Sequence, residues 1–260
     1  MKNTFLDTFS ALRLWRVWKT LSEFDIKKKY KRSFLGPWWV TLSTFILILS
    51  ISFIYAAVLK MDIKTYILNL CLNLIIWFLI RDSIIESCKS LIDSKFLLLN
   101  EKFNIIILSL RVIYRNVLIF LHNIIVYLII LFYLNLDFNY FYILISLFSL
   151  ILVPLFLLPI CISLSIICVR FRDMEMAVSN LMQFLFFVSP ILFTKSALLQ
   201  YEWLILANPI ALLLLCISEP VNLGVIHFEY FQILFFFLLV AYFFCGYIYH
   251  KYKSKIIYWL

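Results

Sequence analysis

The sequence predicts an all-α integral membrane protein with six transmembrane helices, an N-terminal amphipathic helix and a re-entrant helix pair between spans five and six. Hydrophobic residues make up 65% of the 260 residues and charged residues only 14%, whereas soluble domains lie nearer to half and a quarter. The apolar residues also gather in uncharged runs of about 20 residues, the length that a helix needs to cross a bilayer. Finally, the cations fall almost wholly on one side of the topology that these runs define.

The uncharged runs place the spans at about 33–59, 65–86, 113–135, 139–169, 176–194 and 230–249. The second span contains Arg81, whose long side chain we expect to snorkel toward the headgroups. Six spans put both termini on one side of the membrane. Of the 23 Lys and Arg residues, all but Lys60, Lys64 and Lys195 fall on that side, so the positive-inside rule predicts cytoplasmic termini.

The first 32 residues form a cytoplasmic segment before the first span. Phe5, Leu6, Phe9, Leu12 and Trp15 recur at helical spacing, which predicts an amphipathic helix over about 5–19 lying in the membrane interface.

A basic collar follows, KKKYKR from Lys27 to Arg32, and Gly36-Pro37 marks the break before the first span. The net charge of +9 would suggest nucleic acid in a soluble protein. We expect no nucleic-acid partner here, because the collar lies only a few residues from a spanning helix.

Residues 196–228 do not fit a simple span. The stretch 203–218 is uncharged but is interrupted by Asn208-Pro209, and it is short for a crossing. One further crossing would also carry the basic C-terminal tail to the outer side. A re-entrant pair that enters and leaves by one face satisfies both constraints.

The residues that would carry chemistry are sparse. The sequence has no G-x-x-x-x-G-K-[ST] motif for ATP and no His spacing typical of a metal site. The six cysteines are scattered and have no C-x-x-C pair, so we interpret them as small buried hydrophobes. We therefore predict that this chain is not an enzyme and binds no cofactor of its own.

Several stretches, in order along the whole chain, resemble one family. These are DIKKKYKRSFLGPWWVTLST from Asp25, RVIYRNVLIFLHN from Arg111, VRFRDMEMAVSNLMQFLFFVSPILF from Val169, the Asn208-Pro209 pair, and the ending IYWL from Ile257. Together they are similar to the ABC-2 type permeases that export polysaccharides. The form LGPWW-TLST looks closest to exporters of lipid-linked O-antigen.

The resemblance implies a fold, partners and a location. It implies the ABC-2 permease fold and a homodimer in the bacterial inner membrane. Two copies of a separate P-loop ATPase would bind ATP and Mg, and a lipid-linked polysaccharide would be the substrate. The segment 88–104 would hold the coupling helix that sits in a groove of the ATPase.

The family pattern also implies roles for individual residues. Those implied to couple to the ATPase are Asp25, Lys28, Arg32, Ser90, Leu91, Asp93, Phe96, Leu99, Glu101, Arg172 and Asp173. Arg32, Arg111 and Arg115 would contact the lipid headgroup where the substrate enters. Trp77, Tyr127 and Tyr133 are candidates by depth for lining a glycan path.

Plainer interpretations stay open at each position. The basic collar also serves simple orientation, and 88–104 could lie flat on lipid. Arg111 and Arg115 share a helix face and could snorkel to ordinary phospholipid, while Arg172 and Asp173 could form a solvated turn.

Capsule, teichoic acid, a small lipid or a drug are alternative substrates. A membrane-embedded glycosyl- or acyltransferase is the alternative of another class; it would need a cluster of Asp, Glu or His at one membrane face.

Overall fold

The computed structural model describes residues 2–60, 62–100, 103–134, 139–193 and 202–260, and within these the regular structure is entirely helical. The N-terminal and central helices are α1 (Lys2–Arg13), α2 (Trp15–Lys29), α3 (Trp38–Leu59), α4 (Ile63–Asp93), α5 (Lys95–Asn100), α6 (Ile106–Leu134) and α7 (Tyr140–Arg170). The remaining ones are α8 (Met174–Val188), α9 (Glu202–Ala207), α10 (Pro209–Leu223), α11 (Phe228–Tyr252), the 3-10 turn η2 (Lys253–Lys255) and α12 (Ile256–Trp259).

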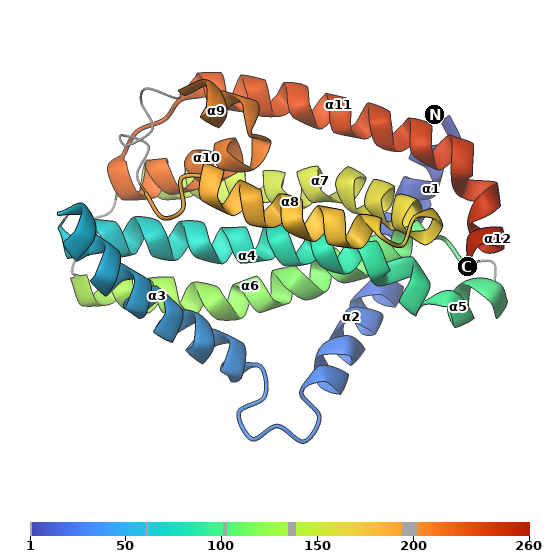
Figure 1. Cartoon of the computed structure of the whole chain (residues 1–260), viewed down its shortest axis with the longest axis horizontal. Helices are drawn as coiled ribbons and strands as arrows, with labels where there is room; N and C mark the ends of the chain where they lie inside the picture. Colours follow the sequence, from blue (N-terminus) through green and yellow to red (C-terminus); the bar gives the residue numbers. More distant parts are fainter. Residues whose placement is uncertain (1, 61, 101–102, 135–138, 194–201) are drawn as a thin grey trace.

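The long helices run along a shared axis, and both ends of the chain lie at one end of the bundle (Figure 1). We call this the termini end, and we call the opposite end, where α4 begins and α6 finishes, the far end. Helix α4 occupies the centre, packed against α6 on one side and α7 on another. Its buried side chains include Leu70, Ile75 and Ile80. Helix α3 splays away from the bundle toward the α2–α3 loop (Figure 1).

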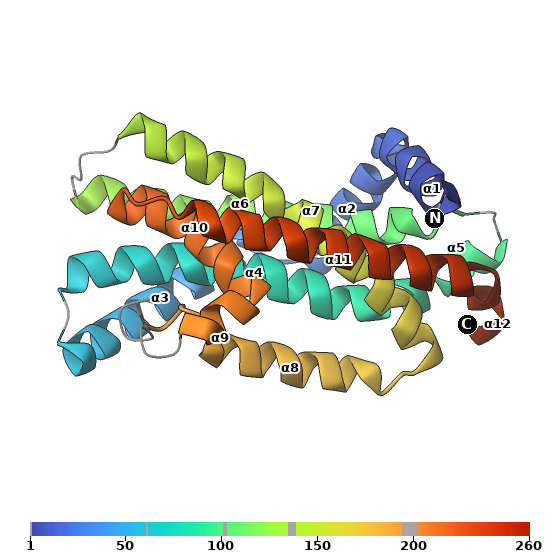
Figure 2. The same ribbon diagram turned by 90° about the horizontal axis from the view of Figure 1, so that it is seen from above.

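Five helices of the described chain are long and apolar enough to cross a membrane: α3, α4, α6, α7 and α11. The fold is therefore that of a helical, multi-pass membrane protein. Helix α8 runs along the same bundle (Figure 2), but its 15 residues extend only about 22 Å. That is shorter than the hydrocarbon core of about 30 Å.

The predicted spans correspond to observed helices, with shifted ends. Helix α3 begins at Trp38 rather than at residue 33, directly after the predicted Gly36-Pro37 break. Pro37 precedes the first helical turn, where a fixed φ and a missing N–H cost nothing. Helices α4 and α6 continue seven residues past the predicted limits at the termini end, to Asp93 and from Ile106. The last turns of α4 contain Glu86, Lys89 and Asp93, whereas the added residues of α6 are mostly apolar and buried.

The N-terminal region differs from the single amphipathic helix expected over 5–19. It forms two helices that meet at Leu14, whose φ and ψ of −83° and 38° lie outside the helical range. Each helix is attached to a different neighbour. Asp7 of α1 accepts a hydrogen bond from Tyr249 of α11, and Asp25 of α2 pairs with Arg111 of α6. The chain must turn between these two attachments.

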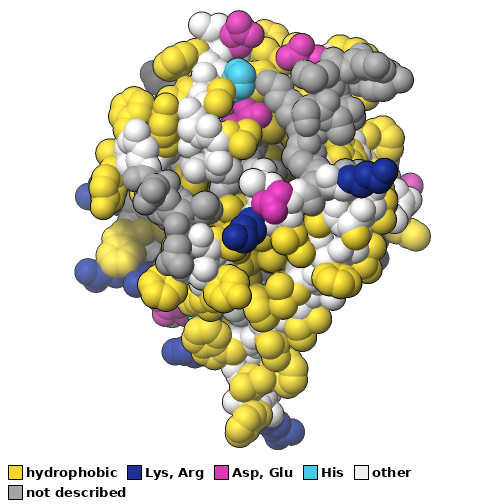
Figure 3. Space-filling model, turned by 90° about the vertical axis from the view of Figure 1, so that its left-hand side faces the viewer, with side chains coloured by type: hydrophobic (Ala, Val, Ile, Leu, Met, Phe, Trp, Pro, Cys, Tyr) yellow, Lys and Arg dark blue, Asp and Glu magenta, His cyan; other side chains and the backbone are white. Residues whose placement is uncertain are grey.

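Polar contacts fix the segments near the far end. Asn208 caps α10 by accepting hydrogen bonds from the backbone N–H groups of Ile210 (3.1 Å) and Ala211 (3.3 Å), and Pro209 follows at the first helical position. Tyr66 and Asn73 of α4 donate to the carbonyls of Leu192 and Pro190. Seen from the far end, hydrophobic side chains dominate the visible surface, with charged groups at scattered points (Figure 3).

Candidate functional site

Four charged side chains from three helices meet in the half of the bundle nearer the termini. The Asp25 carboxylate of α2 accepts a bidentate pair of hydrogen bonds from Arg111 of α6, with Nε to Oδ2 at 2.6 Å. Arg115, one turn further along α6, reaches both Asp25 Oδ2 (3.1 Å) and Glu86 Oε2 of α4 (2.6 Å). Asn116 donates a further hydrogen bond to Glu86 at 2.8 Å. This ion cluster joins α2, α4 and α6.

The ion cluster is largely buried and its charges balance. The Asp25 side chain is 11% exposed and the two arginines about a fifth. Pairing stabilises a buried carboxylate and a buried guanidinium, because a charge that is buried without a partner has a large desolvation cost. Ser22, one turn before Asp25, adds a hydrogen bond from its Oγ to the Arg111 carbonyl at 2.8 Å.

This arrangement bears on two sequence predictions. Arg111 and Arg115 were predicted to contact a lipid headgroup, and Asp25 to couple to an ATPase. The structure brings the three together, so that both guanidinium groups are already engaged by carboxylates. Burial raises the pKa of the Tyr30 phenol at the end of α2, and the nearby negative charge of Glu86 raises it further.

The predicted coupling segment 88–104 divides between two elements. Ser90 and Leu91 lie in the last turns of α4 and are buried. Asp93 is exposed, as are Phe96 (78%) and Leu99 (51%) on the short helix α5. Glu101 lies outside the described residues. The segment therefore presents an apolar surface at the extreme termini end (Figure 1).

The C-terminal tail lies against this segment and the end of α7. Lys95 of α5 donates a hydrogen bond to the Leu260 carbonyl. The Arg170 guanidinium stacks between the rings of Phe171 and Trp259, at 5.1 Å from each centroid. These contacts hold α5, α12 and the α7–α8 turn together.

The other predicted coupling residues are exposed. Arg172 and Asp173 occupy the α7–α8 turn, and Lys28 and Arg32 the end of α2 and the loop after it. Arg32 has a φ of 72°, a left-handed conformation that is uncommon outside glycine. None of these four side chains joins the ion cluster.

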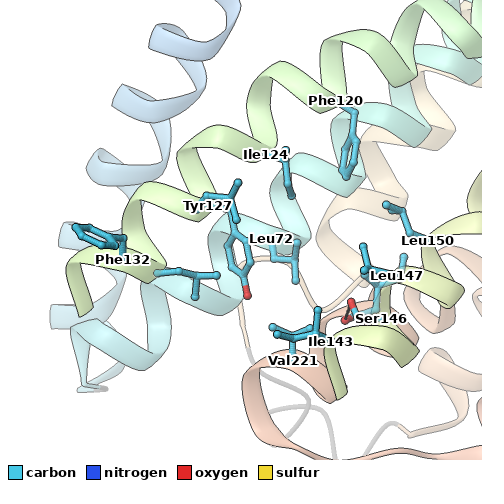
Figure 4. A pocket seen from close by; sticks show the side chains of 13 residues that line it. Leu72, Phe120, Ile124, Tyr127, Phe132, Ile143, Ser146, Leu147, Leu150 and Val221 are labelled. Carbon is cyan, nitrogen blue, oxygen red and sulfur yellow. Dashed lines mark hydrogen bonds between the residues drawn. The ribbon is translucent and has the colours of Figure 1, made fainter. Parts of the chain in front are cut away.

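An apolar groove of about 530 Å³ opens between α6, α7 and α10 (Figure 4). Tyr127 lines it and donates a hydrogen bond to Asn222 of α10 at 2.7 Å; Asn222 in turn donates to Asn69 of α4 at 2.8 Å. The remaining lining is almost entirely Leu, Ile, Val and Phe, which suits an acyl chain better than a sugar.

Of the three aromatic residues predicted to line a glycan path, only Tyr127 borders this groove. Trp77 is buried against Phe186, with ring centroids 5.6 Å apart. Tyr133 is 81% exposed.

Sequence reasoning missed Glu86, Asn116 and the Asn69–Asn222 pair. Glu86 and Arg115 carry opposite charges near the same end of adjacent spans, and this is the one signal that the sequence offered. The sequence could not show which helices are neighbours. Glu86 and Arg115 are 29 positions apart, and they can form an ion pair only because α4 packs against α6.

No protein-family model matches this chain, and no curated protein matches it either. The fold and the site thus define a class of protein: a helical multi-pass membrane protein with a charged cluster near one end. The resemblance to a permease family remains a hypothesis that rests on the sequence motifs alone.

Proposed function

We propose that this chain is the permease subunit of an ABC transporter that exports lipid-linked polysaccharide, with O-antigen as the preferred substrate, across the bacterial inner membrane. In this proposal the chain works as a homodimer, and two copies of a separate ATPase subunit supply the energy. The observation that carries the proposal is the exposed apolar surface on α5, beyond the reach of the bilayer.

Helix lengths support this placement of α5. Helix α4 has 31 residues and is about 46 Å long, against a hydrocarbon core of about 30 Å. Lys60 and Lys64 flank its start, which favours a far-end boundary at that level. The opposite end of α4 then extends about 16 Å past the hydrocarbon and about 8 Å past the headgroup layer. Helix α5 follows from that point, so lipid does not cover Phe96 and Leu99.

Apolar side chains that project into water on a short, rigid helix mark a protein contact. The sequence has no P-loop motif of its own, so an ATP-driven transporter would need this partner for energy. Contacts of α5 with α4 and with the Leu260 carbonyl would link a partner bound there to the bundle.

The topology adds support for six crossings. Both ends of the chain lie at one end of the bundle (Figure 1), which requires an even number of passes, and α8 would supply the sixth. Asn180 and Gln183 are exposed on α8. Polar side chains in this position favour contact with a second copy or with a hydrated substrate rather than with lipid. Helices α9 and α10 would form the re-entrant pair.

The proposal requires a P-loop ATPase encoded beside this chain's gene, and the test is co-expression of the two. Wild type should co-purify with the ATPase, and Phe96→Asp should abolish the complex. Phe228→Asp is the matched control, because Phe228 is similarly exposed (73%) at the far end. Equal retention of the ATPase by both variants would reject the docking role. Unchanged surface polysaccharide after gene deletion would reject export.

A further inference from the structure

A second apolar cavity, of about 1030 Å³, lies under α1. Its walls come from four helices, and its only polar side chains are Thr8 and Tyr242. The apolar lining includes Phe9 and Leu12 of α1, Ile113 of α6, Leu155 of α7, and Phe243 and Gly246 of α11. This cavity is separate from the groove beside Tyr127.

Helix α1 is held above the cavity by polar contacts along one side. The Asp7 carboxylate pairs with Lys253 (2.5 Å) and accepts a hydrogen bond from Tyr249 (3.1 Å). The Asp7 carbonyl accepts from Asn104 Nδ2 at 2.8 Å. These contacts fix the position of α1 relative to α6 and α11. The apolar side chains of α1 therefore leave a cavity between them and α7 and α11. Phe9 remains 66% exposed.

The cavity lies at the depth of one leaflet. On α7 its lining runs from Ile151 to Leu158, about 16 to 27 Å from the far-end start of the helix. On α11 it runs from Tyr242 to Gly246, about 21 to 27 Å from the start. On α6 the lining residues Ile113 and Leu110 lie about 32 to 36 Å from the far-end residue Leu134. With a hydrocarbon core of about 30 Å, the cavity therefore extends from the half of the core nearer the termini to its boundary with the headgroups.

A cation follows the cavity lining on α1: Arg13 comes directly after Leu12. Arg13 ends α1 and is exposed. Helix α1 therefore has an apolar side over the cavity and a positive charge at its end, the pattern of a helix that lies in an anionic interface.

We propose that the cavity is a binding site for one acyl chain of an anionic glycerophospholipid from the leaflet nearer the termini. Its phosphate lies beside Arg13, and its chain fills the space under α1. The lipid completes the packing of α1, which the protein alone leaves open. The proposal requires that the bundle lies in a bilayer, and it does not depend on transport.

The test uses the full chain in vesicles of phosphatidylethanolamine and phosphatidylglycerol, with a phosphatidylglycerol that carries a photoreactive diazirine on one acyl chain. Peptide mapping compares labelling of α1 and of residues 242–246 with labelling of Phe53 on α3, an exposed lipid-facing reference. We expect preferential labelling of the cavity peptides.

Two variants fill the cavity: Gly246→Phe on α11 and Leu155→Trp on α7. Each should lower the cavity labelling at least about fivefold, equivalent to about 1 kcal/mol in binding. Val240→Phe is the matched control, since Val240 lies on α11 outside the cavity lining and should leave labelling unchanged. Arg13→Gln should remove the preference for phosphatidylglycerol over phosphatidylethanolamine.

Three results would overturn the proposal. Even labelling of α1 and α3 that no variant changes would mean ordinary lipid contact without a site. Protection of the cavity in wild type would mean that a second copy covers it. Displacement of the probe by a polyprenyl phosphate more effectively than by unlabelled phosphatidylglycerol would make a polyprenyl lipid the occupant.

Discussion

Replacing Asp25 by Asn tests whether the ion cluster holds α2 to the bundle. Asn keeps the size of the side chain and one carbonyl acceptor, but it removes the charge that Arg111 and Arg115 share. Arg115 retains Glu86. Arg111 retains the one neutral carbonyl acceptor of Asn and a long hydrogen bond to Ser94, at 3.4 Å.

The expected loss of stability follows from how deeply the Asp25 side chain is buried. Exposed ion pairs contribute about 0–1 kcal/mol, whereas removing one partner of a buried pair costs about 3–5 kcal/mol. Asp25 is 11% exposed, which places it toward the buried case, while the remaining acceptors offset part of the loss. We expect Asp25→Asn to lower the free energy of unfolding by about 2 kcal/mol, between these limits. That corresponds to a Tm lower by about 4–8 °C.

The assay is thermal unfolding of the detergent-purified chain, followed by the loss of its monodisperse size-exclusion peak. Glu23→Gln is the matched control on the same helix. Glu23 is 42% exposed and pairs with Lys19 at 3.9 Å, so its loss should cost at most about 0.5 kcal/mol.

A double-mutant cycle sharpens the test. Asp25→Asn combined with Arg111→Gln removes both charges, so the double variant should be less destabilised than the sum of the single variants by at least about 1 kcal/mol. Additive effects, or an Asp25→Asn variant as stable as Glu23→Gln, would refute the reasoning.

Two further substitutions test hydrogen bonds in the half of the bundle nearer the far end. Asn208→Ala should lower stability by at least about 1 kcal/mol, because α10 loses its N-cap and Ser189 Oγ loses the hydrogen bond from Asn208 Nδ2. Asn208→Asp keeps the capping acceptor but loses that donor, so its Tm should lie between those of wild type and Asn208→Ala; equal losses would contradict the capping role. Tyr127→Phe should cost about 0.6–1 kcal/mol, the usual worth of a hydrogen bond between membrane helices, and Tyr133→Phe, at an exposed position, should leave the Tm unchanged.

The positions of the helices were predictable because hydrophobic runs and charges report them directly. Gly36-Pro37 also marked the break before α3 correctly. Asn208-Pro209 was interpreted as an interruption, and it is the N-cap and first residue of α10, which are local signals that the sequence could have given. The end of α4 was less predictable. Its last turns carry Glu86, Lys89 and Asp93, so the hydropathy pattern stops before the helix does.

The site was predictable only where its residues share one helix. Arg111 and Arg115 lie four apart on one face, and the sequence alone places them together. Their partner Asp25 is 86 residues away from Arg111. Recognising that pair requires knowing that α2 packs on α6, which depends on how the whole bundle assembles. The turn at Leu14 was unpredictable for the same reason. It depends on tertiary contacts, because α1 attaches to α11 and α2 attaches to α6.

The contacts of α2 and α3 also determine how motion at the termini end would reach the first span. Both helices pack on α6: α2 through Asp25 and Arg111, and α3 through the Trp38 ring, 6.1 Å from that of His122. These two attachments are 11 residues apart on α6, about 16 Å along one rigid helix. The connecting loop has left-handed residues at Arg32 and Gly36 and a Phe34 side chain that is 99% exposed. The loop also contains local hydrogen bonds, from Ser33 N–H to the Tyr30 carbonyl and from Gly36 N–H to Ser33 Oγ. Helices α2 and α3 are thus linked both through this loop and through their separate attachments to α6. We expect Asp25→Asn to weaken only the attachment of α2, because α3 packs on α6 without the ion cluster.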